Sequence, residues 1–83
     1  MVYDMAQKIL VVDDEEGIVL LLKDYFELQG YEVITAGGGT EALARISCDP
    51  DMIILDINMP DLDGLSVCRK IREKVSCPIL FLT

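Results

Sequence analysis

The stretch from Asp51 to Gly64 reads DMIILDINMPDLDG and decides how the rest of the chain is interpreted. Its apolar residues, Met52 to Leu55, are typical of a short β-strand that is buried in a sheet. Pro60 and Gly64 prevent the residues that follow from continuing directly as a helix. The strand therefore delivers the carboxylate of Asp56 to the start of a loop, where an acid acts as a nucleophile, a metal ligand or a helix cap.

Composition restricts the chain to one small domain. It has 83 residues, of which 52% are hydrophobic, and a mean hydropathy of +0.38, values that favour strands buried on both faces. No apolar run approaches the roughly 20 residues of a membrane span, and the N-terminal extension, residues 1–7, lacks the basic start and apolar core of a signal peptide. We therefore expect a cytoplasmic protein without membrane contact. A net charge of -8 argues against a nucleic-acid surface on this segment.

The chain has three cysteines, Cys48, Cys68 and Cys77, and no histidine. The cysteines form no C-x-x-C pair, which fits unpaired thiols in a reducing compartment. The missing histidine makes a zinc site not credible and excludes a histidine base or a phosphohistidine on this chain. Any partner of a reactive carboxylate must then be another side chain, water or another protein.

Four apolar runs predict β-strands, and the segments between them predict helices. The strands are expected at residues 8–12, 31–35, 52–55 and 79–82, and the helices at about 14–29, at about 41–47 and after Gly64. Short helices that alternate with strands imply right-handed crossovers and a parallel sheet with helices on both faces. The alternating run at 31–35 belongs nearer a sheet edge than the unbroken run at 8–12.

The first helix should begin at Asp14 or Glu15 and end at Gly30. Helical spacing predicts an inner face made of Ile18, Leu21, Leu22, Tyr25 and either Leu28 or Gln29. Further apolar residues widen this stripe, so we expect the helix to be covered on more than one side. For the second helix, Thr40 is the expected cap.

Two other features have simpler interpretations. Gly37-Gly38-Gly39 resembles a phosphate cradle, but it lacks the Lys-Ser/Thr that follows such a loop, so a plain turn is favoured. Asp61 and Asp63 are interpreted as loop acids, and Asp63 favours the turn before Gly64.

Chemistry concentrates at one edge of the predicted sheet. The carboxyl ends of parallel strands meet along one rim, where ligands of open α/β sheets bind. Asp13 and Asp14 follow the first strand, Asp56 follows the third and Thr83 follows the fourth. We therefore expect three carboxylates and a hydroxyl to lie close together there. For Asp13 and Asp14, one can cap the first helix while the other binds metal, or the reverse.

Clustered carboxylates repel one another, which raises the pKa of some of them or recruits a cation. Oxygen ligands without His or Cys favour a hard cation, and Mg²⁺ usually takes one or two carboxylates together with waters and phosphate oxygens. The sequence thus predicts a site for Mg²⁺ and a phosphoryl group, in which one carboxylate can act as a nucleophile.

Four segments in this order resemble the receiver domain of bacterial two-component response regulators. They are Val11-Val12-Asp13-Asp14-Glu15, then Ala36-x-x-Gly39-x-Glu41-Ala42-Leu43, then Asp51 through Asp56 to Met59-Pro60-x-x-Asp63-Gly64, and finally Pro78 to Thr83. The resemblance covers nearly the whole chain from Lys8 onward. It implies a flavodoxin-like, doubly wound α/β fold with the strand order 2-1-3-4.

The resemblance also implies a role for each rim residue. Asp56 would accept a phosphoryl group from a sensor histidine kinase and switch the conformation that controls an output domain. In most regulators of this family the output domain is transcriptional. Asp13 and Asp14 would hold Mg²⁺ together with Asp56 and the backbone carbonyl of Asn58. Thr83 would be the switch hydroxyl that bonds the phosphoryl group in the active state.

Receiver domains continue past this hydroxyl with a helix, a fifth strand that ends in a lysine, and a final helix, none of which is in the printed chain. That lysine contributes charge stabilisation in the transition state. We expect the fourth strand to form an exposed apolar edge, open to a homodimer or to domain-swapped association.

Three alternatives to a regulatory phosphoacceptor remain open. A Mg²⁺-dependent phosphatase or phosphotransferase that forms an aspartyl phosphate commonly has a second acid two residues after the nucleophile, where this chain has Asn58. A flavodoxin-like cofactor binder would need Ser, Thr and Gly after the first strand in place of Asp13-Asp14-Glu15. A non-phosphorylated interaction fragment would keep only the fold.

Overall fold

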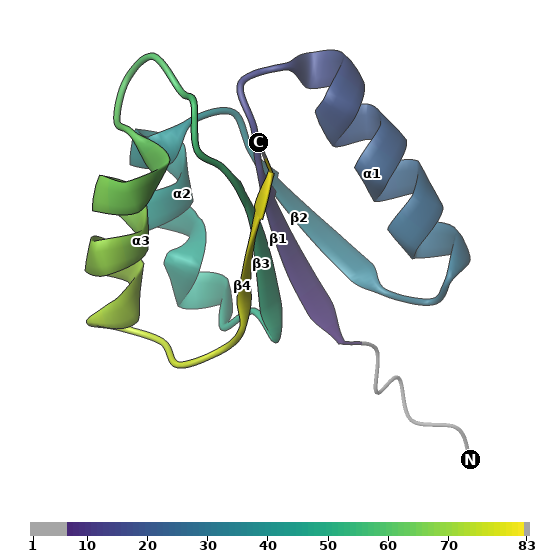
Figure 1. Cartoon of the computed structure of the whole chain (residues 1–83). Helices are drawn as coiled ribbons and strands as arrows, with labels where there is room; N and C mark the ends of the chain where they lie inside the picture. Colours follow the sequence, from purple (N-terminus) through teal and green to yellow (C-terminus); the bar gives the residue numbers. More distant parts are fainter. Residues whose placement is uncertain (1–6, 83) are drawn as a thin grey trace.

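The computed structural model describes residues 7–82, which form a parallel sheet with helices on both faces (Figure 1). The elements are β1 (Lys8–Val12), α1 (Glu16–Leu28), β2 (Glu32–Ala36), α2 (Gly39–Arg45), a 3-10 turn (Ile46–Cys48), β3 (Met52–Asp56), α3 (Gly64–Arg72) and β4 (Ile79–Leu82). The four strands are ordered β2-β1-β3-β4, and every neighbouring pair is parallel. The predicted fold class and strand order are confirmed.

The central strand β1 separates two apolar cores, because successive side chains of a strand point to opposite faces. Ile9 and Val11 pack on the face that α1 covers, whereas Leu10 and Val12 pack on the face that α2 and α3 cover. Val11 is level with Thr35 on β2 and with Ile54 on β3. All four strands therefore end at the same rim, as Figure 1 shows.

The inner face of α1 differs from the predicted one. Val19, Leu22 and Phe26 pack against the core, whereas Leu21 and Tyr25 are 69% and 56% exposed. Leu28 is also exposed. The prediction was wrong for these residues because the apolar stripe is wider than the strip of helix that one face of the sheet covers. Among the described residues, nothing covers the outer side of α1.

This correction predicts unequal costs for two substitutions in α1. Phe26 is half-buried and packs edge-on against Tyr31, with 5.8 Å between ring centroids, so Phe26→Ala should lower the free energy of unfolding by about 2–3 kcal/mol. Leu28 is 84% exposed, so Leu28→Gln should change it by less than about 0.5 kcal/mol. Urea unfolding of both variants measures the difference. Equal losses would show that α1 buries a different face.

The second helix begins differently from the prediction. α2 starts at Gly39 with Gly38 as its N-cap residue, so Thr40 lies inside the first turn and does not cap the helix. The N–H groups of Gly39 and Thr40 instead donate to the carboxylate of Asp61 in a distant loop. Asp61, which the tertiary fold brings close, therefore accepts the hydrogen bonds at the start of α2 in place of Thr40.

The third helix begins where the sequence predicts, at Gly64. Its N-cap is Asp63, whose Oδ1 accepts a hydrogen bond of 2.9 Å from the Ser66 N–H. Asp56 is therefore free of the capping function that could have explained its presence after β3.

The remaining expectations about surfaces have mixed outcomes. β4 is the last strand of the described sheet, and its residues Leu80 and Phe81 are exposed, as expected of an edge. Association through that edge stays a prediction. Within residues 7–82, no helix combines the length and the apolar character that crossing a bilayer requires. The N-terminal extension lies outside the described residues except for Gln7.

Candidate functional site

The structure brings three acids together at the carboxyl ends of β1 and β3. These strands are neighbours, with Val12 level with Leu55. One carboxylate oxygen from each of Asp13, Asp14 and Asp56 lies within 4.8 Å of the others. The sequence predicted that acids following parallel strands lie together at one rim of the sheet. This prediction is confirmed for these three residues, which come from two separate segments.

Asp13 is the buried member of this cluster, with only 2% of its surface exposed. Its N–H donates to the Ala36 carbonyl at 3.1 Å, and its Oδ1 accepts from the Glu15 N–H at 2.9 Å. Burial raises the pKa of Asp13, the nearby Asp56 and Asp14 raise it further, and the Glu15 N–H opposes them. A charged Asp13 is therefore costly in the folded chain unless a cation is near.

Asp56 lies at the end of β3, where the backbone next to it and its own carboxylate both form hydrogen bonds. It is level with Leu82 on β4, and the next residue, Ile57, donates its N–H to the Leu82 carbonyl at 3.2 Å. Its Oδ1 accepts a hydrogen bond of 3.0 Å from the Asn58 N–H. Asp56 is half-buried, so solvent still reaches the site.

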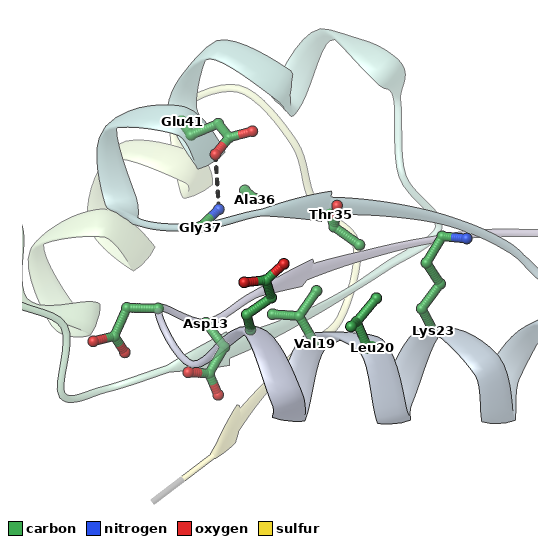
Figure 2. Close-up of a pocket in the computed structure, with 10 residues that line it drawn as sticks. Asp13, Val19, Leu20, Lys23, Thr35, Ala36, Gly37 and Glu41 are labelled. Atoms are coloured by element: carbon green, nitrogen blue, oxygen red, sulfur yellow. Dashed lines mark hydrogen bonds between the residues drawn. The ribbon is translucent and has the colours of Figure 1, made fainter.

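Two open pockets lie on either side of Asp13. One, of about 330 Å³, brings Asp13, Asp56 and Asn58 together with Leu82. The other, of about 470 Å³, lies between α1 and β2 and includes Asp14 (Figure 2). In Figure 2, Glu41 accepts a bond of 2.8 Å from the Gly37 N–H in the second pocket. Only the first pocket contains the predicted nucleophile and Asn58.

The donor set fits a hard cation. All three side chains offer carboxylate oxygens, the chain contains no histidine, and the clustered negative charge needs neutralising. Asp13, Asp14, Asp56 and the Asn58 carbonyl remain the predicted ligands of Mg²⁺. The predicted switch hydroxyl, Thr83, lies outside the described residues, directly after Leu82.

This geometry predicts opposite effects of Asp13→Asn with and without Mg²⁺. A raised pKa in the folded state means that the fold loses stability as the pH rises from the ordinary carboxyl pKa through the raised one, because the folded chain holds the Asp13 proton more tightly than the unfolded chain does. Asp13→Asn should therefore raise the free energy of unfolding in the absence of metal. With Mg²⁺ at 100 times its dissociation constant, the unsubstituted chain should gain about 2.7 kcal/mol, and the variant should gain far less.

Chemical unfolding with and without Mg²⁺ measures both effects. Asp24→Asn is the matched control, because Asp24 is an exposed acid on α1 and should respond to Mg²⁺ like the unsubstituted chain. An unchanged Mg²⁺ response in Asp13→Asn would remove Asp13 from the metal site.

Sequence reasoning missed one residue that touches this region. Asp61 was interpreted as a plain loop acid, yet its carboxylate binds the start of α2 across 21 and 22 residues of chain. No local pattern could have found it, because its partners are backbone N–H groups. The sequence indicates a role for Asp61 only through its place in the loop after Asp56.

Comparison with known proteins agrees with this arrangement. The family model described as response regulator receiver domain matches residues 9–83. The chain is 53% identical over 81 residues to the alkaline phosphatase synthesis transcriptional regulatory protein PhoP of Bacillus subtilis, which covers 95% of this chain and 34% of PhoP. The chain thus spans about a third of the length of the curated relatives it matches.

Solved structures show the same fold. The chemotaxis protein CheY4 of Vibrio cholerae superimposes with a TM-score of 0.88 at 36% identity, covering 92% of this chain and 67% of CheY4. The response regulator TrrA of Thermotoga maritima, solved in complex with the histidine kinase ThkA, gives a TM-score of 0.83 at 47% identity, covering 93% of this chain and 68% of the matched chain.

Proposed function

This chain belongs to the response regulator receiver domain family, and we propose that Asp56 is its phosphoacceptor and that a sensor histidine kinase is the donor. One observation carries the proposal: Asp56 ends a central strand with its carboxylate within 4.8 Å of Asp13 and Asp14. The complex of the related TrrA with the kinase ThkA supports the choice of donor.

The chemistry follows from the placement of Asp56. A carboxylate oxygen attacks the phosphorus of a phosphohistidine on the kinase, an O–P bond forms, and the N–P bond breaks with its electron pair passing to the imidazole. The Asn58 N–H orients the carboxylate through Oδ1. Asp56 is only half-buried, so the attacking group is accessible to a partner without unfolding of β3.

We assign Mg²⁺ binding to Asp13, Asp14, Asp56 and the Asn58 carbonyl. When bound, Mg²⁺ would neutralise charge on the transferring oxygens. The related TrrA has been solved in complex with Mg(2+)-BeF, which supports this assignment. Asp13 would serve the metal from a buried position, where its charge is otherwise costly.

The proposed output is a conformational switch rather than turnover of a substrate. Thr83 would bond the new phosphoryl group and shift the end of β4. The names of relatives such as PhoP and ResD support transcriptional control by the longer protein. An aspartyl-phosphate phosphatase is the weaker candidate, because Asn58 stands where such enzymes commonly have a second acid.

Intact-mass measurement after incubation with a small phosphodonor and Mg²⁺ tests the proposal. We expect one phosphoryl adduct, dependent on Mg²⁺, and peptide mapping should place it on the peptide that contains Asp56. An adduct on another peptide would overturn the assignment of Asp56 as the acceptor. No adduct on a folded chain that binds Mg²⁺ would mean that residues 1–83 form a metal site and scaffold only.

A further inference from the structure

The loop that follows Asp56, residues 57–63, has no helix or strand of its own and is fixed by individual contacts. Near the site, the Asn58 N–H bonds Asp56. In the middle, the side chain of Met59 is buried in the core beneath α2 and α3. At its end, the Gly64 N–H donates to the Ile57 carbonyl at 2.9 Å. The position of Asn58 therefore depends on what holds the loop.

Asp61 joins this loop to α2 through hydrogen bonds. Its Oδ1 accepts from the Gly39 N–H at 3.1 Å and from the Leu62 N–H at 2.8 Å, and its Oδ2 accepts from the Thr40 N–H at 3.0 Å. These three backbone donors lower the pKa of Asp61 to about 2, so the carboxylate is fully charged at physiological pH.

The glycines opposite the loop make room for this contact. A Cβ added at Gly38 would lie 2.9 Å and 3.1 Å from the two carboxylate oxygens of Asp61. A Cβ added at Gly39 would lie 2.6 Å from Val67 Cγ2 and 2.8 Å from Leu62 Cβ. The Gly38 backbone is extended, with φ −178°, a conformation that any residue can adopt. Space, rather than conformation, is therefore what Gly38 supplies.

We propose that Asp61 is a positioning residue of the phosphoacceptor site, which fixes Asn58 by tying the 57–63 loop to the first turn of α2. The inference rests on the proposed function of Asp56 and adds a residue to it. α2 has no side-chain cap of its own, so its first turn is completed from the loop. The loop and the start of α2 then behave as one body, and a change at either is felt at the other.

Two substitutions break the contact in different ways. Asp61→Ala removes the carboxylate. Gly38→Ala keeps the charge but places a methyl group against both oxygens. Gly37→Ala is the matched control, because its added Cβ would meet Glu41 Oε1 at 3.4 Å, an ordinary contact.

The readouts are amide hydrogen exchange by NMR and the dissociation constant of Mg²⁺ by calorimetry. Asp61→Ala should accelerate exchange at Gly39, Thr40 and Asn58, and should weaken Mg²⁺ binding roughly tenfold, as loss of groups that orient metal ligands does. Gly38→Ala should reproduce both effects, and the double variant should add little, because the two changes break one contact. Asp61→Asn, with a single side-chain oxygen, should be intermediate.

Other outcomes separate the explanations. Faster exchange at Gly39 and Thr40 with unchanged exchange at Asn58 and unchanged Mg²⁺ affinity would make Asp61 a helix cap only, and would overturn the inference. If the unsubstituted chain binds no Mg²⁺, the proposed metal site is wrong. Exchange at Asn58 then still shows whether Asp61 fixes the position of that residue. Should Asp61→Ala not fold, Gly38→Ala and Asp61→Asn give the same comparison.

Discussion

Asp56→Asn should leave no phosphoryl adduct on the chain, whereas the unsubstituted chain should acquire one. An amide is a poor nucleophile, so the attacking atom is lost. The fold should survive, because the Asn oxygen can still accept the bond that the Asn58 N–H donates to Asp56 Oδ1. The substitution also removes a negative charge that raises the pKa of Asp13. Loss of the adduct would therefore report on chemistry and not on unfolding.

Asp24→Asn is the control for this experiment, because it removes the same charge from an exposed position on α1. It should take up phosphate in the same yield as the unsubstituted chain. Intact mass, with circular dichroism to verify folding, decides the comparison. An undiminished adduct on Asp56→Asn would mean that another acid accepts the phosphoryl group.

Gly64→Ala should be among the most destabilising single-methyl additions in this chain, with a loss of about 3 kcal/mol in the free energy of unfolding. The added Cβ would lie 2.6 Å from the Asp56 carbonyl oxygen and 2.6 Å from Ile57 Cα. Both are backbone atoms and cannot rotate away as a flexible side chain can. Relief of the clash requires α3 to move from the end of β3, which would also displace Asp56.

Gly17→Ala provides the opposite result from the same chemical change. Gly17 lies in α1, and no described atom outside its own helix and chain neighbours comes within 4 Å of its added Cβ. The substitution should therefore stabilise the chain by about 0.5–1 kcal/mol, through helix propensity alone. Urea unfolding measures both variants, and similar small effects would show that α3 does not approach β3 closely at Gly64.

The sheet could be predicted from the sequence because β1, β3 and β4 contain continuous apolar runs, and only β2 alternates. β1 occupies Lys8–Val12, as predicted, since such a run can be buried on both faces only in the middle of a parallel sheet. The same reasoning placed Asp13, Asp14 and Asp56 together, because strand direction alone brings their ends to one rim. Their proposed roles as ligands and acceptor are further steps that the phosphorylation and metal-binding experiments test.

The errors arose where the tertiary structure chose among local options. The spacing of apolar residues in α1 is compatible with two overlapping buried faces. In the folded chain Val19 and Phe26 pack against the sheet, and Leu21 is exposed. At α2 the sequence offered Thr40 as a cap, but Asp61 supplied acceptors from another loop. Neither outcome can be predicted from the local sequence pattern, because each depends on which surfaces come into contact when the chain folds.

The uncovered side of α1 has a consequence for how the described domain behaves in concentrated solution. Leu20, Leu21, Tyr25 and Leu28 lie exposed along this helix. At neutral pH the net charge of -8 keeps molecules apart despite this apolar strip. Near the isoelectric point, about pH 4.2, that repulsion vanishes and the strips can adhere. Colloidal stability therefore reaches its minimum near pH 4.2.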